Sequence, residues 1–464
     1  MARVEGYGVE PVPAALRTGS WRDLFAINLA FFLNPLMYVV GALAVTSGGL
    51  PLWWAVGCLV SAQVVSFVLL TVVARVGVDY GIPGQVAVRS TLGYWGARLI
   101  SSVYRAIAAI YWCASQALAG GFGIQALTSG LFGWHLRLVP IALGFAALQG
   151  VLAVLGFDVL RWVMKVILPL AVMFVAVILV LYFTTDNPNY QPSRVFDSPD
   201  QHLTWLGFAT WMTVMVGSSL TAVTTMADFC RYTRSRRDMT IGFTASGLIA
   251  GFLTTFVGGY AAAASGERNP FVAGSDLTGS KVLLALLLIA VIVQMIAVCI
   301  MNLYSAGLAL VNTFPRAGRL WTTAAAACAA FGLSAFPGFV NNAEKWITHL
   351  GSVAAPLAGV MLVDYLVFHR QQLDVDELYE PAGRYRYSGG FNPSAFAAIA
   401  VTVPVYYAVP GEWLKWVWGL GLGAVAYYVL RRLQGAIGRP LLADRAAGPA
   451  VVSAIPPPKG VPCE

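Results

Sequence analysis

Two residues of one apolar stretch have the types and the spacing to bind a small, flat, polar ring. Trp112 and Gln116, in YWCASQALAGG, are four positions apart, so a helix would place both on one face. An indole can stack on a ring, and an amide can donate and accept hydrogen bonds. Asn302 is a second amide within an apolar stretch, with Tyr304 close by. These side chains could bind a neutral heterocycle, or they could be packing contacts between membrane helices.

The apolar stretches contain no set of residues for catalysis or metal binding. The cysteines show no CxxC pairing, the four histidines form no cluster, and no His, Asp, Glu or Cys set lies within a hydrophobic run. We therefore predict that the protein is not an enzyme, has no catalytic residue and holds neither a metal nor a cofactor. No filter-like stretch favours a channel.

The composition is that of a membrane protein. Only 11% of the 464 residues are charged, whereas soluble domains carry about 25%. We predict an all-α polytopic membrane protein embedded in the lipid bilayer, with about twelve transmembrane helices by a hydropathy window of roughly 19 residues. The predicted apolar cores are 24–46, 52–74, 99–127, 136–156, 160–184, 204–227, 241–264, 282–311, 319–336, 347–368, 394–410 and 413–430.

Basic residues predict the orientation in the membrane. They concentrate in the even-numbered connections between the cores, for example Arg75 and Arg231, and an excess of Lys and Arg marks the cytoplasmic side. Both termini are therefore expected in the cytoplasm, and the chain in the cytoplasmic (plasma) membrane. Because the net charge of +8 arises in these short connections, it does not indicate nucleic-acid binding. No obligate protein partner is predicted.

Two predicted spans contain helix-breaking residues near their middle. The first contains Asn34-Pro35, and the sixth contains Gly217-Ser218-Ser219. Small hydroxylated residues at this depth could be a helix-packing contact. However, paired interruptions at equivalent positions of two five-helix halves indicate a transporter site built on broken helices. We therefore predict breaks at Asn34, Pro35 and Gly217, with freed backbone near Ser218 and Ser219.

The predicted spans group into segments without a separate soluble domain. They are a cytoplasmic segment (1–22), a first five-helix repeat (23–184), a second, inverted repeat (204–368), a cytoplasmic loop (369–393), helices eleven and twelve (394–432), and a cytoplasmic tail (433–464) whose composition predicts disorder.

Several segments together resemble nucleobase–cation symporter family 1, which comprises cytosine, purine, hydantoin and allantoin permeases. The resemblance covers about Trp21 to Leu433 and implies a five-plus-five inverted-repeat (LeuT-like) transporter fold with broken helices one and six, working by alternating access. It also implies that Trp112 stacks on the substrate and that Gln116 and Asn302 hydrogen-bond it. The segments that carry it are YGIPGQVAVRSTLGYWGARL, the Trp112 and Gln116 pair, VGSSLTAVTTMADFCRYTR, NTFPR, PLAGVMLVDYLVFHR and DELYEPAGRYRY.

The sixth span follows the cytosine-permease pattern most closely, as VGSxxxAxTxxADFxR, with one departure. Ser219 stands where relatives in that family carry an aromatic residue. The missing ring could come from Phe32, Tyr38 or Tyr304. The expected substrate-binding residues are Trp112, Gln116, Gly217, Ser218, Ser219 and Asn302.

The coupling ion stays open between H⁺ and Na⁺. In family members that use sodium, carbonyls of the first span and a hydroxyl pair of the eighth hold the ion. The corresponding positions here are near Leu33 and Leu36, and at Ile296 and Ala297, which carry no hydroxyl. Sodium prefers oxygen ligands, as other hard cations do. Lys165 in the fifth span could exchange protons in place of an ion, or it could simply obey the orientation rule.

Together these observations predict a permease that imports a nucleobase or a related nitrogen heterocycle, with cytosine or a purine as the first expectation. The alternatives are a transporter of the same fold for allantoin, hydantoin, hydroxymethylpyrimidine or an amino acid. An amino acid would need its carboxylate held at broken-helix N-termini, and the neutral side chains favour a neutral ring. A membrane-embedded enzyme or a channel is a distant alternative.

Overall fold

Helices make up most of the computed structural model, which describes residues 8–154, 157–196 and 203–436. The side chains of residues 154–166, 297, 341 and 435–436 also lie outside the description. Nearly all of the tail that is predicted to be disordered therefore lies outside the described residues, as do the first seven residues.

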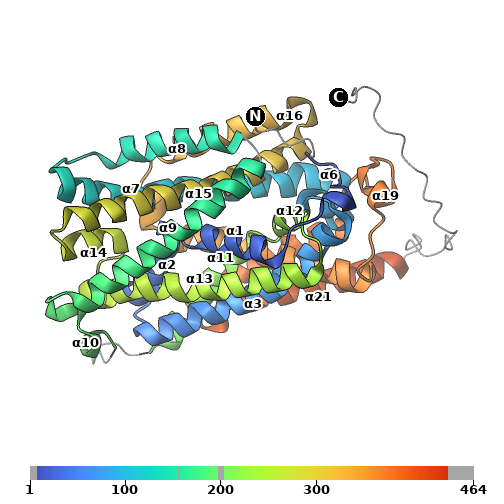
Figure 1. Ribbon diagram of the computed structural model, residues 1–464. Helices are drawn as coiled ribbons and strands as arrows, with labels where there is room; N and C mark the ends of the chain where they lie inside the picture. The colour runs from blue at the N-terminus through green and yellow to red at the C-terminus, as the bar shows by residue number, and fades with distance from the viewer. Residues whose placement is uncertain (1–7, 155–156, 197–202, 437–464) are drawn as a thin grey trace, which may run out of the picture.

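Each predicted apolar core corresponds to one helix or to a broken pair (Figure 1). In chain order they are α1 (Trp21–Phe32) with α2 (Pro35–Thr46), α3 (Leu52–Tyr80), α7 (Ser102–Phe132), α8 (Leu138–Val154), α9 (Phe157–Thr184), α11 (Trp205–Leu220) with α12 (Met226–Cys230), α13 (Arg236–Ser265), α15 (Lys281–Thr313), α16 (Gly318–Leu333), α18 (Ala343–Val363), α20 (Pro393–Ala408) and α21 (Lys415–Ala436). Among the described residues, six single helices are long and apolar enough to cross a membrane, and α1 with α2 forms a seventh candidate. The prediction of an all-α polytopic protein is confirmed.

Short helices occupy the two ends of the bundle. One end holds the connection between α3 and α7, and the other holds the connection between α13 and α15 (Figure 1). The segment 369–393 is more ordered than a solvated loop, because Leu378 and Tyr385 are buried against the first of these connections. The short helices are α4 (Gly84–Ala87), α5 (Arg89–Leu92), α6 (Tyr94–Gly96), α10 (Pro192–Phe196), α14 (Pro270–Leu277), α17 (Gly338–Asn341) and α19 (Val375–Tyr379).

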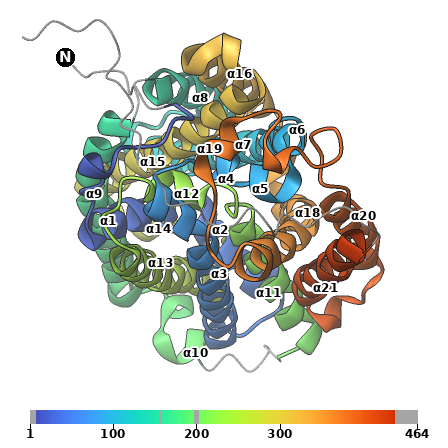
Figure 2. The same ribbon diagram turned by 90° about the vertical axis from the view of Figure 1, so that its right-hand side faces the viewer.

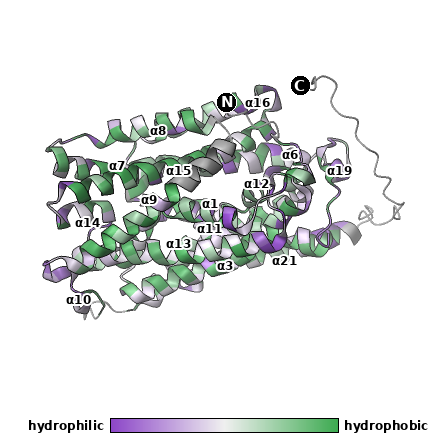
Figure 3. Ribbon diagram, viewed as in Figure 1, coloured by the Kyte–Doolittle hydropathy of each residue, from purple (hydrophilic) through white to green (hydrophobic). Residues whose placement is uncertain are grey.

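Viewed along its length, the bundle places α2 and α12 near its middle, α8 and α16 at one edge, and α20 and α21 at another (Figure 2). The long helices are predominantly hydrophobic along their middle, and hydrophilic residues gather at the ends, most densely around α19 (Figure 3). This distribution suits a bundle that spans a bilayer, because only the ends would meet water. The division into two inverted repeats stays a prediction.

The first break lies where the sequence predicts it. α1 and α2 are bent by 60° across Leu33 and Asn34. Asn34 caps α2, because its Oδ1 accepts the Met37 N–H at 2.9 Å and its Nδ2 donates to the Phe31 carbonyl at 2.7 Å. Pro35 occupies the first helical position, where a missing N–H costs nothing. Asn34-Pro35 thus starts a new helix instead of kinking a continuous one.

The second break lies later than predicted. α11 continues through Gly217, Ser218 and Ser219 to Leu220, and the chain is unwound at residues 221–225 before α12 begins. An added Cβ at Gly217 would lie 3.1 Å from the Cα of Gly351, so this glycine permits the close crossing of α11 and α18. Because Gly217 serves this helix–helix contact, it is compatible with a continuous helix, and the backbone does not open there. The prediction of a break at Gly217 is therefore wrong, although the prediction of a broken sixth span is correct.

A second close crossing joins α2 to α13 and supports one prediction. An alanine Cβ at Gly258 would lie only 1.9 Å from the carbonyl oxygen of Tyr38. We expect Gly258→Ala to lower the thermal unfolding midpoint of the purified protein by several degrees, because overpacking costs about 1–3 kcal/mol. Gly144→Ala on α8 is the matched control, since no atom lies within 4 Å of its added Cβ. Equal midpoints for the two variants would contradict this packing.

Candidate functional site

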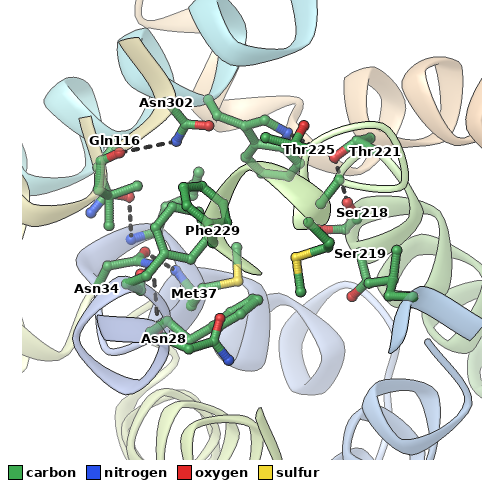
Figure 4. Close-up of a pocket in the computed structure, with 18 of the residues that line it drawn as sticks. Asn28, Asn34, Met37, Gln116, Ser218, Ser219, Thr221, Thr225, Phe229 and Asn302 are labelled. Carbon is green, nitrogen blue, oxygen red and sulfur yellow. Dashed lines mark hydrogen bonds between the residues drawn. The ribbon is translucent and has the colours of Figure 1, made fainter. Parts of the chain in front are cut away.

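A pocket lies where the two helix breaks face α7 and α15. Figure 4 shows Asn34 and Met37 from the first break, Ser218 and Thr221 from the second, and Gln116 of α7 around one space. Its polar lining residues are Asn28, Asn34, Arg105, Trp112, Gln116, Ser218, Ser219, Thr221, Thr225 and Asn302. The structure thus brings together five of the six residues expected to bind substrate. Gly217 is not among the lining residues, because it faces α18.

Trp112 is fixed to the unwound part of the sixth span. Its indole N–H donates to Thr221 Oγ1 at 3.2 Å, and the Thr221 hydroxyl donates to the Ser218 carbonyl at 2.6 Å. The side chain is 8% exposed, so nearly all of the indole is already desolvated. A bound ring would therefore meet an aromatic face whose orientation is held by the break itself.

Gln116 presents an unused hydrogen-bond donor. Its Oε1 accepts the backbone N–H of Leu36 at 3.2 Å. Because a backbone N–H can only donate, this contact fixes which end of the amide is oxygen. The Nε2 group is buried and has no hydrogen-bond partner. Thr225, at the end of the unwound segment, likewise has a buried hydroxyl without a partner. Both residues line the pocket, so a ligand bound there could supply the missing hydrogen-bond partners.

Asn302 and Arg105 form a second polar part of the pocket wall. Arg105 donates from one terminal guanidinium nitrogen to Asn302 Oδ1 at 3.3 Å and from Nε to Ser305 Oγ at 3.2 Å. Asn302 Nδ2 donates to the Val298 carbonyl at 3.2 Å. Arg105 is not among the residues expected from the sequence, although a charged residue within an apolar core usually has a function.

The aromatic walls differ from those expected. Phe32 lines the pocket, but Tyr38 packs instead against Phe174, with ring centroids 5.2 Å apart. Tyr304 also lies outside the lining, and its hydroxyl accepts a hydrogen bond from Arg231 at 3.0 Å. The prediction that Tyr38 and Tyr304 line the pocket is therefore wrong.

Phe229 of α12 lines the pocket and was not anticipated from the sequence. Figure 4 shows it near the centre, between Gln116 and Asn302 on one side and Ser218 and Ser219 on the other. The predicted core of the sixth span ends at residue 227, two residues before this ring. Ser219 itself donates to Gln63 Oε1 at 3.3 Å, so its hydroxyl bonds a neighbouring helix.

The expected ion region is only partly described. Leu36 lines the pocket, Leu33 is buried beside the break, and Ile296 is half-buried on α15. The side chains of Ala297 and Lys165 lie outside the described residues. In the part of the chain that the structure describes, no group of three or more His, Cys, Asp or Glu side chains could hold a metal ion. The coupling ion stays a prediction.

The chain is similar to known permeases along most of its length. Residues 11–430 match the sequence model of a family described as "Permease for cytosine/purines, uracil, thiamine, allantoin". The hydantoin permease of Microbacterium maritypicum is 24% identical over 408 residues, which cover 84% of this chain and 81% of that protein. The allantoin permease of Bacillus subtilis (strain 168) is 23% identical over 486 residues, covering 91% and 92%.

Among solved structures, the chain is similar to Mhp1, a nucleobase–cation-symport-1 family transporter, in a closed conformation with bromovinylhydantoin bound. The TM-score is 0.81 at 22% sequence identity, and the superposition covers 95% of this chain and 98% of that one. This similarity confirms the predicted transporter fold.

Proposed function

The chain belongs to the family of permeases for cytosine, purines, uracil, thiamine and allantoin, and on this premise we propose that it imports a nitrogen heterocycle by alternating access. Membership makes it a multi-pass membrane transporter and not an enzyme. We further propose that it resides in the cytoplasmic membrane with both termini in the cytoplasm, as the basic connections indicate.

The observation that carries the substrate proposal is a pair of unused donors on residues that line the pocket together with Trp112. Gln116 Nε2 and the Thr225 hydroxyl are buried without partners, and both line the pocket beside Trp112. A ring carbonyl or an unprotonated ring nitrogen would accept from either donor, whereas an exocyclic amino group facing Gln116 Nε2 would leave that donor unsatisfied. Leaving a buried donor unsatisfied costs about 1–3 kcal/mol. The pocket therefore fits rings that present two acceptors, such as the carbonyls of uracil, hydantoin and allantoin, or the C2 carbonyl and N3 of cytosine.

Transport would follow from movement of the broken helices against α7 and α15. The ring would stack on Trp112 and accept from Gln116, which α7 carries, while Thr225 contacts it from the sixth span. Because α2 and α13 interlock at Gly258, the first and seventh spans would move together. No covalent step is needed. The coupling ion would be H⁺ or Na⁺, and the absence of a hydroxyl at Ile296 weakens the case for sodium.

An uptake panel tests the proposal. Proteoliposomes would be given uracil, hydantoin, allantoin, cytosine or adenine, each with and without a sodium gradient and with and without a pH gradient. We expect uptake of at least one carbonyl-bearing ring, because its carbonyl can accept the hydrogen bond that Gln116 or Thr225 otherwise lacks. Uptake of none of these rings would contradict the proposed function.

A further inference from the structure

Arg105 places a positive charge in the wall of the substrate pocket. The residue is 4% exposed, and its hydrogen bonds go to the neutral oxygens of Asn302 and Ser305. Among the described residues it forms no ion pair with a carboxylate. Burying a guanidinium is costly unless a negative charge compensates it.

The nearest negative charge is shared. Asp228 of α12 is buried and attracts both Arg105 and Arg231. Its own hydrogen bonds come from the Gly84 N–H at 2.7 Å and the Ser305 hydroxyl at 3.4 Å. Asp228 therefore offsets part of the charge on Arg105 from a distance, without a direct hydrogen bond to it. An anionic ligand in the pocket would supply further compensation.

A second cavity, of about 650 Å³, lies at the end of the bundle that carries α14. Arg137 and Arg268 line it, and neither has an ion-pair or hydrogen-bond partner within the described residues. Glu267 is the acidic residue of this lining, and its carboxylate accepts the Asn269 N–H at 2.9 Å. His135 also faces the cavity. Two guanidinium groups therefore oppose one carboxylate.

The two cavities lie in succession along the same helices. α2 contributes Met37 to the substrate pocket and Val39 to the second cavity. α7 contributes Gln116 to the pocket and Phe122 to the cavity, six residues further on, which is about 9 Å at 1.5 Å per residue. The second cavity thus lies beyond the pocket, toward this end of the bundle. Clefts lined by one sign of charge concentrate ligands of the opposite sign.

Building on the proposed function, we propose that the carried heterocycle is an anion, namely a carbonyl-bearing ring with a carboxylate or another ionised group. The ring carbonyls would accept from Gln116 and Thr225, and the negative charge would interact with Arg105. Arg137 and Arg268 would raise the local concentration of this anion before it enters. Two independent observations carry the proposal, one in the pocket and one at its entrance.

Matched pairs of compounds test the charge directly. Uracil and orotate share one ring and differ by a carboxylate. Hydantoin and hydantoin-5-acetic acid share another ring and differ by a carboxymethyl group. With the full-length protein in nanodiscs, we expect the anion to bind about tenfold more tightly than its neutral partner in at least one pair, because hydrogen bonds between charged groups are stronger than those between neutral groups. Arg105→Gln should remove the difference, whereas Arg105→Lys, which keeps the charge, should retain part of it.

The entrance is tested by the rate of uptake. Arg137→Gln combined with Arg268→Gln should slow initial uptake of the anion severalfold at low ionic strength and leave the neutral partner unchanged. Arg194→Gln, on α10 outside the cavity, is the charge control. If uracil and hydantoin each bound as tightly as their anionic partners, or more tightly, the anion proposal would be overturned and the proposed function would stay intact. Failure of every ring in the uptake panel would overturn both.

Discussion

Trp112→Ala is expected to lower substrate affinity by about tenfold or more, because stacking of a ring on an aromatic side chain contributes about 1–3 kcal/mol. The substitution also removes the indole N–H that holds Thr221 at 3.2 Å, so the unwound segment loses a contact. Equilibrium binding to the purified protein, with the ring that the uptake panel selects, measures the effect.

The control for this variant is Trp321→Ala on α16, whose side chain is 69% exposed and outside the pocket lining. It should bind the ring as the wild type does. If Trp112→Ala retained wild-type affinity, the ring would not stack on this indole, and the site would have to lie elsewhere.

Gly84→Ala is expected to abolish transport. An added Cβ at Gly84 would lie 2.0 Å from the backbone carbonyl oxygen of Thr224, within the unwound segment. The clash is with backbone atoms, so a side-chain rotation cannot relieve it. The whole unwound segment, including Thr225, would have to shift. The Gly84 N–H also donates to Asp228 at 2.7 Å, which ties the same connection to α12.

Uptake and the thermal unfolding midpoint should both be measured for Gly84→Ala. Loss of uptake is expected whether or not the midpoint falls, and Gly144→Ala should change neither by much. Wild-type uptake with a wild-type midpoint would show that the connection after α3 does not support the unwound segment.

The spacing rules of a helix explain which site residues the sequence could predict. Trp112 and Gln116 share a face at four residues' separation, and both line the pocket. Arg105 lies seven residues, or two turns, before Trp112, so the same rule could have identified it. Tyr304 is two residues from Asn302 and so points to the opposite side of α15. Its closeness to Asn302 in the sequence suggested Tyr304 as a pocket residue, but helical geometry places it outside the pocket lining.

The two breaks show where local chemistry is sufficient and where it is not. Asn34-Pro35 specifies a cap and a first helical position by itself, so the first break was predictable. Gly217 depends on its surroundings, because a glycine in contact with Gly351 is compatible with a continuous helix. This contact joins residues far apart in the sequence, so it could not be inferred from the residues next to Gly217. Phe229 was missed for a related reason, since it reaches the pocket only because the chain turns at residues 221–225.

The most direct test of the central claim is a structure of the protein with the selected heterocycle bound. The ring is expected to lie against the Trp112 indole at the two helix breaks, with one carbonyl within hydrogen-bond distance of Gln116 Nε2. A ring bound away from these breaks, or one whose amino group faces Gln116 Nε2, would contradict the claim.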